Sequence, residues 1–513
     1  MASTTRLNKK TVVKPSVINV AAKNNLEVGI SGNGNLQFKK EPLQHLYEIV
    51  VSSLFGKDTY YQSANQLVNN LVKETVQVVK MDELDFVANL AIHARTDMNI
   101  RTMPIVLVVQ FAKALRDQHK SYDNMRRLVC DVIQRADQIT DLYAYALTVF
   151  GDKKYVPMAI KRGVADAFNK YGEYHFAKYN RNSSAVKFRD VLRIVHPKAK
   201  SVEQGVIFQK IMEDKLQTPY TWETELSMNG QLAASEQKSK KQLWTELVSS
   251  NKMGYMATLR NLRNMLDAGI DNNIKTDVAK LLSDPTQVAK SKQLPFDFVE
   301  AYKIVKPMDS KLTTAVSKAI DISCENIPQI GNNIWIIIDY SGSMGNNDAI
   351  AINNATLMAA GLIKSSSNVD NLAITLFGSA AKTLDGIDTN NSVMGIQQDL
   401  LRHRIGNIAG STDFNAALNE RKNLKFVPDT IIVFTDGEVN RFPYPNIRNL
   451  ATTNDAIKIT VNMNAATTTP MIREDGWMAL AGWSTAIFKF IPLIRNKVSV
   501  TDLLSGPYIS LSK

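Results

Sequence analysis

The sequence predicts two kinds of structure in one chain: an all-helical N-terminal part and a C-terminal α/β part built on a parallel sheet. The chain has 513 residues, which is too many for one hydrophobic core, so we expect two or more domains. Apolar residues recur with helical spacing from Pro42 onward. After Pro328 the pattern changes to short apolar strands that alternate with helical segments.

The first 35 or so residues are polar and rich in Asn, Gly and Lys, and we expect a flexible arm there. The helical segments that follow are joined by short polar links, which favours successive antiparallel helix pairs. We expect helices at 46–55, 63–79, 82–94, 104–116, 122–133, 141–150, 155–168, 202–213, 254–267, 274–282, 296–305 and 311–320. Residues 231–242 are polar and charged, and we expect an exposed loop. No regular repeat is visible, so the pattern indicates an irregular α-solenoid or bundle.

In the C-terminal part, continuous apolar strands are expected at 334–338, 372–377, 430–434 and 457–463, with helices between them. Strands that are apolar on both faces are typical of a parallel sheet covered by helices on both sides. The crossovers between such strands are expected to be right-handed.

Charge divides the chain in the same way as the secondary structure. Residues 1–320 carry a net charge of +14 and residues 321–513 carry −2, within a total of +12. A basic domain attracts polyanions, among which nucleic acid is the commonest in the cytoplasm. The alternative from charge alone is a basic protein with no such partner.

Composition also excludes some classes of protein. No run of about 18 uncharged apolar residues is present, and the first residues lack the apolar core of a signal peptide, so we expect neither a membrane span nor secretion. We expect a cytoplasmic monomer. Cys130 and Cys324 are far apart and flanked by apolar residues, which indicates buried thiols in a reducing compartment.

The most informative motif follows the strand at 334–338, where the chain reads Asp339-x-Ser341-x-Ser343. In open α/β sheets, ligands bind at the carboxyl ends of the strands. Carboxylate and hydroxyl oxygens are hard ligands that suit Mg²⁺. The alternative is that Asp339 and Ser341 only cap the following helix. Further oxygen ligands, Thr412 in a loop and Asp436 after the strand at 430–434, favour the metal site.

These five residues resemble the von Willebrand factor A domain and its metal-ion-dependent adhesion site. The resemblance implies a divalent ion, which we expect to be Mg²⁺, in direct contact with Ser341, Ser343 and Thr412. It further implies that Asp339 and Asp436 hold waters and that an open position accepts an acidic oxygen of a partner.

Between residues 171 and 200, basic side chains are interleaved with aromatic ones. Cations bind phosphates and aromatic rings stack on bases, so this composition favours RNA. The rings are Tyr171, Tyr174, Phe176 and Tyr179, and some of them are expected in the helix core instead. His196 precedes a proline, which disfavours helix at that residue, so we expect a helix end near the surface.

This segment, the later MGYMATLRNLRNM (residues 253–265) and the metal motif resemble, in that order, the Ro RNA-binding proteins, whose helical part is the TROVE module. The resemblance spans roughly residues 20 to 495. It implies an α + α/β fold: a ring-shaped, HEAT-like helical-repeat TROVE domain closed by a Rossmann-like von Willebrand factor A domain. The expected divisions are an arm at 1–35, the TROVE domain at 36–325, the metal-binding domain at 326–495, and a C-terminal segment at 496–513 that returns to the ring.

The resemblance also implies a non-catalytic scaffold for RNA quality control. A structured small RNA, the Y RNA, binds the outer surface, and misfolded non-coding RNAs place single-stranded 3′ ends in a central hole. By position, the outer face contains Lys178, Arg181, Lys187, Arg189, His196 and Lys198, and the inner rim contains Arg95 and Arg101.

Two other functions are weighed against this one. The first is a protein-interaction module in which the metal site captures a partner such as an exoribonuclease, with RNA binding secondary. The second is a Mg²⁺-dependent nuclease, which normally needs clustered carboxylates and a general base. Hydroxyl groups fill this motif instead, and the nearest further acid in sequence is Glu438.

Overall fold

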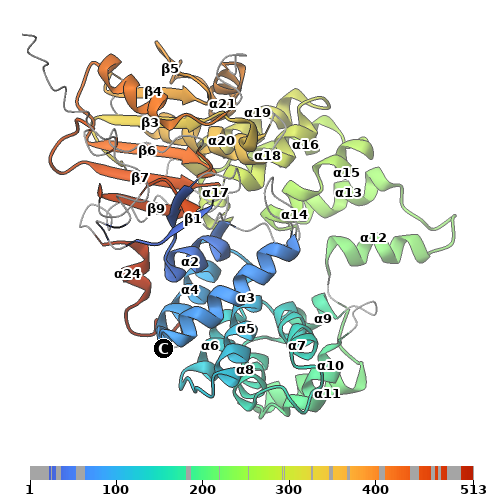
Figure 1. Cartoon of the computed structure of the whole chain (residues 1–513). Coiled ribbons are helices and arrows are strands. Elements are labelled where there is room, and N and C mark those ends of the chain that lie inside the picture. Colours follow the sequence, from blue (N-terminus) through green and yellow to red (C-terminus); the bar gives the residue numbers. More distant parts are fainter. Residues whose placement is uncertain are drawn as a thin grey trace, which may run out of the picture.

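The computed structural model describes residues 22, 24, 26–30, 36–52, 64–180, 186–218, 220–251, 253–291, 293, 295–324, 327, 329–345, 350–366, 370–403, 411–439, 447, 450–463, 468–471, 475–481 and 498–511. Within these residues, the N-terminal part is helical and the C-terminal part contains a six-stranded sheet. Figure 1 shows the helices on a curved path that begins and ends beside the sheet. None of the described helices is long and apolar enough to cross a lipid bilayer.

The helical part runs from α2 to α19. Its members are α2 (Pro42–Ser52), α3 (Ala64–Lys80), α4 (Leu84–Thr96), α5 (Met103–Asp117), α6 (Met125–Val132), α7 (Asp137–Phe150), α8 (Met158–Phe168), α9 (Glu173–Tyr179), α10 (Phe188–Val195), α11 (Val202–Glu213), α12 (Trp222–Gln231), α13 (Lys240–Ser249), α14 (Tyr255–Arg260), α15 (Leu262–Asp267), α16 (Asn272–Leu282), α17 (Pro285–Ser291), α18 (Pro295–Val305) and α19 (Ser310–Cys324). Neighbouring helices pack in pairs such as α4 with α5 and α18 with α19.

The large sheet has the strand order β5-β4-β3-β6-β7-β9. Its strands are β3 (Ile334–Asp339), β4 (Leu372–Phe377), β5 (Ala381–Thr383), β6 (Thr430–Thr435), β7 (Ile457–Asn462) and β9 (Trp477–Ala481). All neighbours pair in parallel except β5, which is antiparallel to β4. The predicted combination of a helical part and a mainly parallel sheet is therefore confirmed.

Both faces of this sheet are buried, as the apolar strands predict. Successive side chains of a strand point to opposite faces. Ile336 and Ile338 of β3 join the core that contains α20 (Ile350–Ser365) and α21 (Val393–Arg402). Trp335 and Ile337 join a second core with α22 (Phe414–Asn419). The first core continues without interruption into the helical part.

The helical part meets the sheet at two places, and one of them is covalent. There α19 packs against α20 and α21 before the chain enters β3. A Cβ atom built on Gly361 of α20 would lie only 3.3 Å from the sulfur of Cys324, so glycine permits this close approach. Asp321 accepts a hydrogen bond of 2.9 Å from the backbone N–H of Val393, the first residue of α21.

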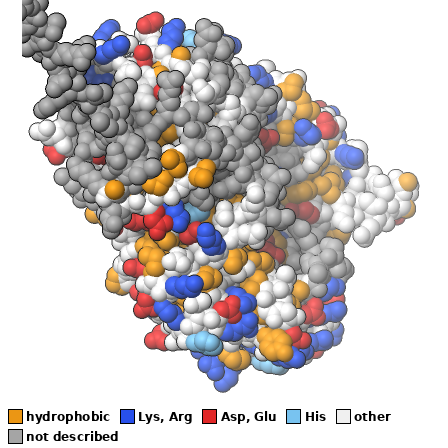
Figure 2. Space-filling view, in the orientation of Figure 1, with side chains coloured by type: hydrophobic (Ala, Val, Ile, Leu, Met, Phe, Trp, Pro, Cys, Tyr) orange, Lys and Arg blue, Asp and Glu red, His pale blue; other side chains and the backbone are white. Residues whose placement is uncertain are grey.

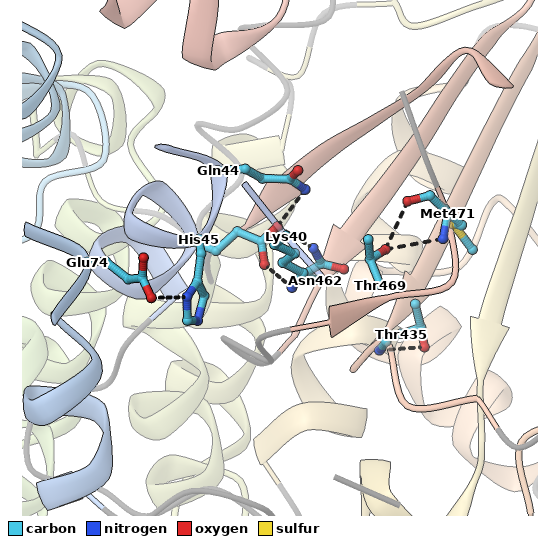
Figure 3. Close-up of polar contacts among 10 residues, drawn as sticks. Lys40, Gln44, His45, Glu74, Thr435, Asn462, Thr469 and Met471 are labelled. Atoms are coloured by element: carbon cyan, nitrogen blue, oxygen red, sulfur yellow. Dashed lines mark hydrogen bonds and ion pairs between the residues drawn. The ribbon is translucent and has the colours of Figure 1, made fainter. Parts of the chain in front are cut away.

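The second meeting place, which we call the seam, joins α2 to the far edge of the sheet without chain continuity. Here α2 packs against β9, and a hairpin of β1 (Val28–Ile30) and β2 (Leu36–Lys39) pairs with β8 (Thr468–Thr469). Lys40 forms a buried ion pair of 2.5 Å with Glu48. Glu48 also accepts 2.8 Å and 3.1 Å hydrogen bonds from the side-chain amides of Asn462 and Gln44 (Figure 3).

A C-terminal segment of residues 498–511 crosses from the sheet to the helices; we call it the strap. Its helix α24 (Val500–Leu504) packs against α4 and α2. Asn89 of α4 donates hydrogen bonds to the carbonyl groups of Leu504 and Gly506 and accepts one of 2.7 Å from the N–H of Ile509. Tyr508 donates to the buried carboxylate of Asp131.

Several local features differ from the sequence predictions. The predicted arm at 1–35 includes the strand β1. The predicted boundary between this arm and the helical domain, before residue 36, falls inside the β1–β2 hairpin. Residues 1–21 of the arm lie outside the described residues. The pairing partner, β8, is too distant in sequence for a local pattern to reveal. Helix α12 was not expected; none of its side chains is fully buried, and Trp222 and Leu226 are its half-buried contacts with the core. Cys130 is only half-buried, whereas Cys324 is buried as predicted; both are free thiols.

Candidate metal site and nucleic-acid interface

The predicted metal ligands Asp339 and Asp436 follow adjacent parallel strands. In the register of β3 with β6, Ile338 pairs with Phe434, so the two strands end side by side. Asp339 is completely buried and Asp436 is 3% exposed. The structure therefore places both carboxylates at the carboxyl edge of the sheet, where ligands bind in open α/β folds.

Local turns hold the neighbouring hydroxyl groups at the same edge. The short 3₁₀ helix η1 (Gly342–Met344) brings the hydroxyl oxygens of Ser341 and Ser343 to 3.1 Å from each other. Asp339 Oδ1 accepts a 2.8 Å hydrogen bond from the backbone N–H of Ser341. Ser341 is buried and Ser343 is half-buried. The two hydroxyl groups therefore lie at the edge of the sheet and are only partly accessible to solvent.

Thr435 was not among the predicted site residues, yet it fixes the position of Asp339. Its hydroxyl donates a 2.6 Å hydrogen bond to Asp339 Oδ2. It also accepts one of 3.1 Å from the N–H of Gly437 (Figure 3). Gly437 has φ = 81°, a conformation that favours glycine. In the sequence, Thr435 could have been recognised as a site residue because it is a polar residue at the last position of an otherwise apolar strand.

Thr412 is the fifth predicted ligand, and it lies at this edge as a buried residue. Its neighbour Asp413 donates its backbone N–H at 2.7 Å to the carbonyl of Gly378, directly after β4. Because β4 is the neighbour of β3, with Asp339 paired to Phe377, the loop of Thr412 approaches the carboxylates from the β4 side. The residues before this loop, 404–410, lie outside the described residues.

The electrostatics of the two carboxylates favour a cation. Burial raises the pKa of Asp436, and the charge of Asp339 raises it further, against hydrogen bonds from Ser343 and the Glu438 backbone. Burial also raises the pKa of Asp339. In the part of the chain that the structure describes, the buried Oδ2 of Asp436 has no hydrogen-bond partner. Two like charges close together and out of water are unfavourable unless a positive charge compensates them.

The donor set fits Mg²⁺, because that ion takes one or two carboxylates, hydroxyl oxygens and waters. Ser341 and Ser343 would contact the ion, and Asp339 and Asp436 would hold its waters. Among the described residues, no group of three or more His, Cys, Asp or Glu side chains is placed to hold a metal. A site for softer metals or a carboxylate-rich two-metal site is therefore not formed by these residues.

The predicted outer RNA face lies on α9, α10 and the loop that follows α10. Lys178, His196 and Lys198 are exposed, whereas Lys187 and Arg189 are half-buried at the start of α10. Arg181 lies outside the described residues. Two further basic residues of the segment 171–200, Arg193 and Lys200, are exposed on the same stretch.

His196 ends α10 as the sequence predicts, but its backbone is left-handed rather than extended, with φ = 45° and ψ = 62°. The loop after it is anchored to the end of α8. Asn169 donates a 3.0 Å hydrogen bond to the carbonyl of Lys198 and accepts one of 3.1 Å from the N–H of Lys200. One asparagine thus holds the backbone of Lys198 and Lys200, directly after His196.

The aromatic residues of this segment divide between core and surface. Phe176 is fully buried against Phe168 and Phe188. Tyr171 is 8% exposed and donates its hydroxyl to the carbonyl of Ile133. Tyr174 is 50% exposed, and the ammonium of Lys178 lies 5.9 Å from its ring centre. Of the four predicted rings, Tyr174 is the one best placed to stack on a base.

Basic side chains are not gathered into one uninterrupted patch on the face shown in Figure 2, where they alternate with acidic ones over the helical part. Ion pairs such as Arg126–Asp166 and Lys210–Glu173 account for part of this alternation. The surplus of positive charge in the helical part is therefore found at local clusters of basic side chains. The loop after α10 is one such cluster.

The two residues predicted for the inner rim, Arg95 and Arg101, lie together but differ in exposure. Arg95, in the last turn of α4, is 7% exposed, whereas Arg101 is exposed. Burial lowers the pKa of Arg95, and the charges of Arg101 and Arg135 lower it further. Arg135 was not predicted as a site residue, because nothing in its local sequence shows that it lies beside α4.

Comparisons with known proteins agree with this architecture. The sequence profile of the TROVE domain matches residues 37–214 and 210–333. Telomerase protein component 1 of Rattus norvegicus is 23% identical over 364 residues, and that of Mus musculus is 22% identical over the same length. Each match covers 55% of this chain but only 13% of the relative.

A solved structure is similar over nearly the whole chain. The crystal structure of the Deinococcus radiodurans Ro (Rsr) protein superposes with a TM-score of 0.60 and 16% sequence identity. The alignment covers 89% of this chain and 100% of that chain. At this identity the similarity concerns the fold, a helical repeat followed by a mainly parallel sheet.

Proposed function

The chain belongs to the TROVE domain family, and from this membership we propose that it is a non-catalytic RNA-binding scaffold of a small ribonucleoprotein. A structured small RNA, such as a Y RNA, binds the outer face formed by α9, α10 and the following loop. Misfolded non-coding RNAs place single-stranded 3′ ends in the central hole that the resemblance to Ro proteins implies. The result is quality control by binding, without hydrolysis.

The observation that carries this proposal is the anchored loop after α10. It presents His196, Lys198 and Lys200 as exposed side chains on a backbone that Asn169 holds. Phosphate contacts from such cations dominate the affinity for RNA. A rigid cationic surface recognises the shape of an RNA helix, whose base edges are hard to read from outside.

The metal site adds a second binding function to the same molecule. Mg²⁺ held by Ser341, Ser343 and Thr412 has an open position for the carboxylate of a protein partner, for which an exoribonuclease is the candidate. The buried Oδ2 of Asp436, which has no hydrogen-bond partner among the described residues, supports metal binding. In the alternative function, this protein-interaction module is the main activity and RNA binding is secondary. A nuclease is disfavoured because two carboxylates and several hydroxyl groups are a poor set for two-metal catalysis.

Replacing His196 by Ser tests the outer face. We expect binding of a structured small RNA to weaken by about tenfold, because a stacking or phosphate contact is lost. Binding of a single-stranded oligonucleotide should change little. The matched control is His119→Ser, because His119 is also an exposed histidine with a left-handed backbone, φ = 53°.

Titration of both RNAs over a range of salt concentrations completes the test. The logarithm of the binding constant should fall linearly with the logarithm of the salt concentration. Equal losses for both RNAs in His196→Ser would contradict two separate surfaces. Absence of RNA from the purified protein, together with a flat salt dependence, would contradict the RNA scaffold itself.

A further inference from the structure

The two edges of the large sheet differ in how they are covered. At one edge, β9 packs against α2, and the hairpin and the strap line a small cavity beside it. The other edge lies on the side of the sheet away from α2 (Figure 1). There β5 has three residues and pairs with only the last three of the six residues of β4. The first half of β4 therefore lies beyond the end of β5.

The backbone of Leu372, the first residue of β4, is unpaired at this edge. The carbonyl of Ile374 accepts a 2.8 Å hydrogen bond from the N–H of Leu384, the first residue after β5. Backbone groups of alternate residues in a strand point to the same side, so the N–H and C=O of Leu372 point the same way as those of Ile374. The described residues after Leu384 form no further backbone hydrogen bond with β4. Leu372 thus presents a donor and an acceptor to which another strand can pair.

A groove with a volume of about 490 Å³ lies directly beside this edge. Leu384 and Ile387 line it and pack on the first core, whereas Leu424 and Phe426 line it and pack on the second core. The two cores lie on opposite faces of the sheet, so the groove lies between the two layers that cover the sheet. A strand added beside β4 would lie about 4.8 Å from it, in this space.

The groove carries a surplus of negative charge. Asp370 and Asp385 line it as exposed carboxylates without an ion pair among the described residues. Glu420 also lines it and accepts hydrogen bonds of 3.1 Å and 2.8 Å from the N–H and the hydroxyl of Thr383, so it holds β5 in place. Lys425 is the only cation among the described residues that line the groove.

We propose that this groove binds a basic peptide segment of a protein partner, which adds to the sheet as a strand beside β4. Main-chain hydrogen bonds to Leu372 hold such a strand, and its alternate side chains point to opposite faces. Apolar side chains of the peptide contact the apolar walls, and Lys or Arg side chains face Asp370 and Asp385. The partner segment is therefore one in which apolar and basic residues alternate.

The site is distinct from the metal site and from the RNA surface. The metal ligands lie at the carboxyl ends of the strands, whereas the groove lies beside the start of β4. The proposal goes beyond the proposed function, because it needs neither RNA nor a metal. A second copy of the same edge is a poor occupant, since it would place Asp370 and Asp385 against like charges.

The test measures the binding of fluorescently labelled octapeptides to the full-length protein by anisotropy. Valine and lysine alternate in the first peptide. Glutamate replaces lysine in the second, and proline, which cannot donate a main-chain hydrogen bond, replaces valine in the third. We expect the first peptide to bind about tenfold more tightly than either of the others. Asp370→Asn together with Asp385→Asn should weaken its binding about fivefold, because two exposed ion pairs are lost.

Asp388→Asn is the control, because Asp388 is exposed on the same loop as Asp385 but does not line the groove; it should bind the first peptide like the wild type. Hydrogen exchange at residues 372–374 should slow when the first peptide is bound, and exchange in β9 should not change. Equal binding of the valine and proline peptides, or protection outside β4, would overturn the strand addition.

Two further results would also overturn the proposal. Loss of peptide binding in EDTA would place the peptide at the metal site. A free protein that is dimeric, with residues 372–374 already protected, would show that a second copy covers this edge. Neither result bears on RNA binding, which His196→Ser tests separately, so failure of the groove and failure of the proposed function are distinguishable.

Discussion

The two places where the helical part meets the sheet are built from different interactions. At the covalent junction, α19 packs on α20 and α21 through apolar contacts and the close approach at Gly361. At the seam, a buried ion pair, side-chain amides and a hairpin join segments that are far apart in the chain. The strap, which packs on α2 and α4, adds hydrogen bonds to Asn89 of α4.

The difference follows from connectivity. Chain continuity keeps α19 beside β3, so non-directional apolar packing suffices there. At the seam, α2 and β9 must find each other, and apolar surfaces alone permit many relative orientations. Directional buried hydrogen bonds restrict that choice, because each is favourable only when its partner is correctly placed. Removing one partner of such a set is correspondingly costly.

The largest effect is expected from Glu48→Ala. The substitution leaves the ammonium of Lys40, whose side chain is 1% exposed, without its counter-charge, and it also removes an acceptor of Asn462. We expect a loss of about 3–5 kcal/mol in stability. Thermal unfolding measures this loss of stability, and hydrogen exchange in α2 and β7 shows whether it is located at the seam.

Glu27→Ala is the control for that variant, because Glu27 forms an exposed ion pair with Lys39 in the hairpin. It should leave the unfolding temperature nearly unchanged. If Glu48→Ala is as stable as this control, the polar network does not hold the seam together.

Asn89→Ala should have the second largest effect. It removes the side-chain bonds to Leu504, Gly506 and Ile509, each worth about 1 kcal/mol, so we expect a loss of about 2–3 kcal/mol. Hydrogen exchange should rise in residues 498–511 and at the end of α2 but not in α19. Asn272→Ala, at an exposed position on α16, is the control. Unchanged exchange in the strap would show that its apolar contacts hold it without Asn89.

Mg²⁺ should stabilise the seam more than the covalent junction. The loop after Asp436 touches the hairpin, since Gln37 donates a 3.3 Å hydrogen bond to the carbonyl of Val439. At about ten times its Kd, a bound ion should add about 1.4 kcal/mol. Ser343→Ala should weaken this gain, because it removes one hydroxyl ligand and leaves both carboxylates in place. Protection from hydrogen exchange that is equal in β2 and α19 would rule out the proposed coupling.

The sequence predicted the parts of this molecule that are encoded locally. Continuous apolar strands predicted β3, β4, β6 and β7, and because parallel neighbours end at one edge, Asp339 and Asp436 could be placed together. The same reasoning reached Ser341 and Ser343, which lie within four residues of Asp339. Whether these residues bind a metal in the cell stays a prediction.

Contacts between distant segments were not predictable in this way. Asn462 reaches Glu48 across 414 positions of the chain, and no periodicity records that pairing. Arg135 stands beside Arg95 because α4 and α7 place their ends together through Gln138. The sequence showed the basic surplus of the helical part, but only the fold shows which of these cations lie near one another.

The smallest effect is expected at the covalent junction, from Asp321→Ala. This side chain is half-buried and accepts the N–H of Val393 at the start of α21, so its loss should cost about 1 kcal/mol, as for a helix cap. Increased hydrogen exchange should be confined to the first turn of α21, because apolar packing and chain continuity keep α19 in place. Asp385→Ala, an exposed aspartate of the same part of the chain, is the control and should change nothing. A loss as large as that of Glu48→Ala, or exchange that spreads to β7 and β9, would mean that the two junctions depend equally on buried polar bonds.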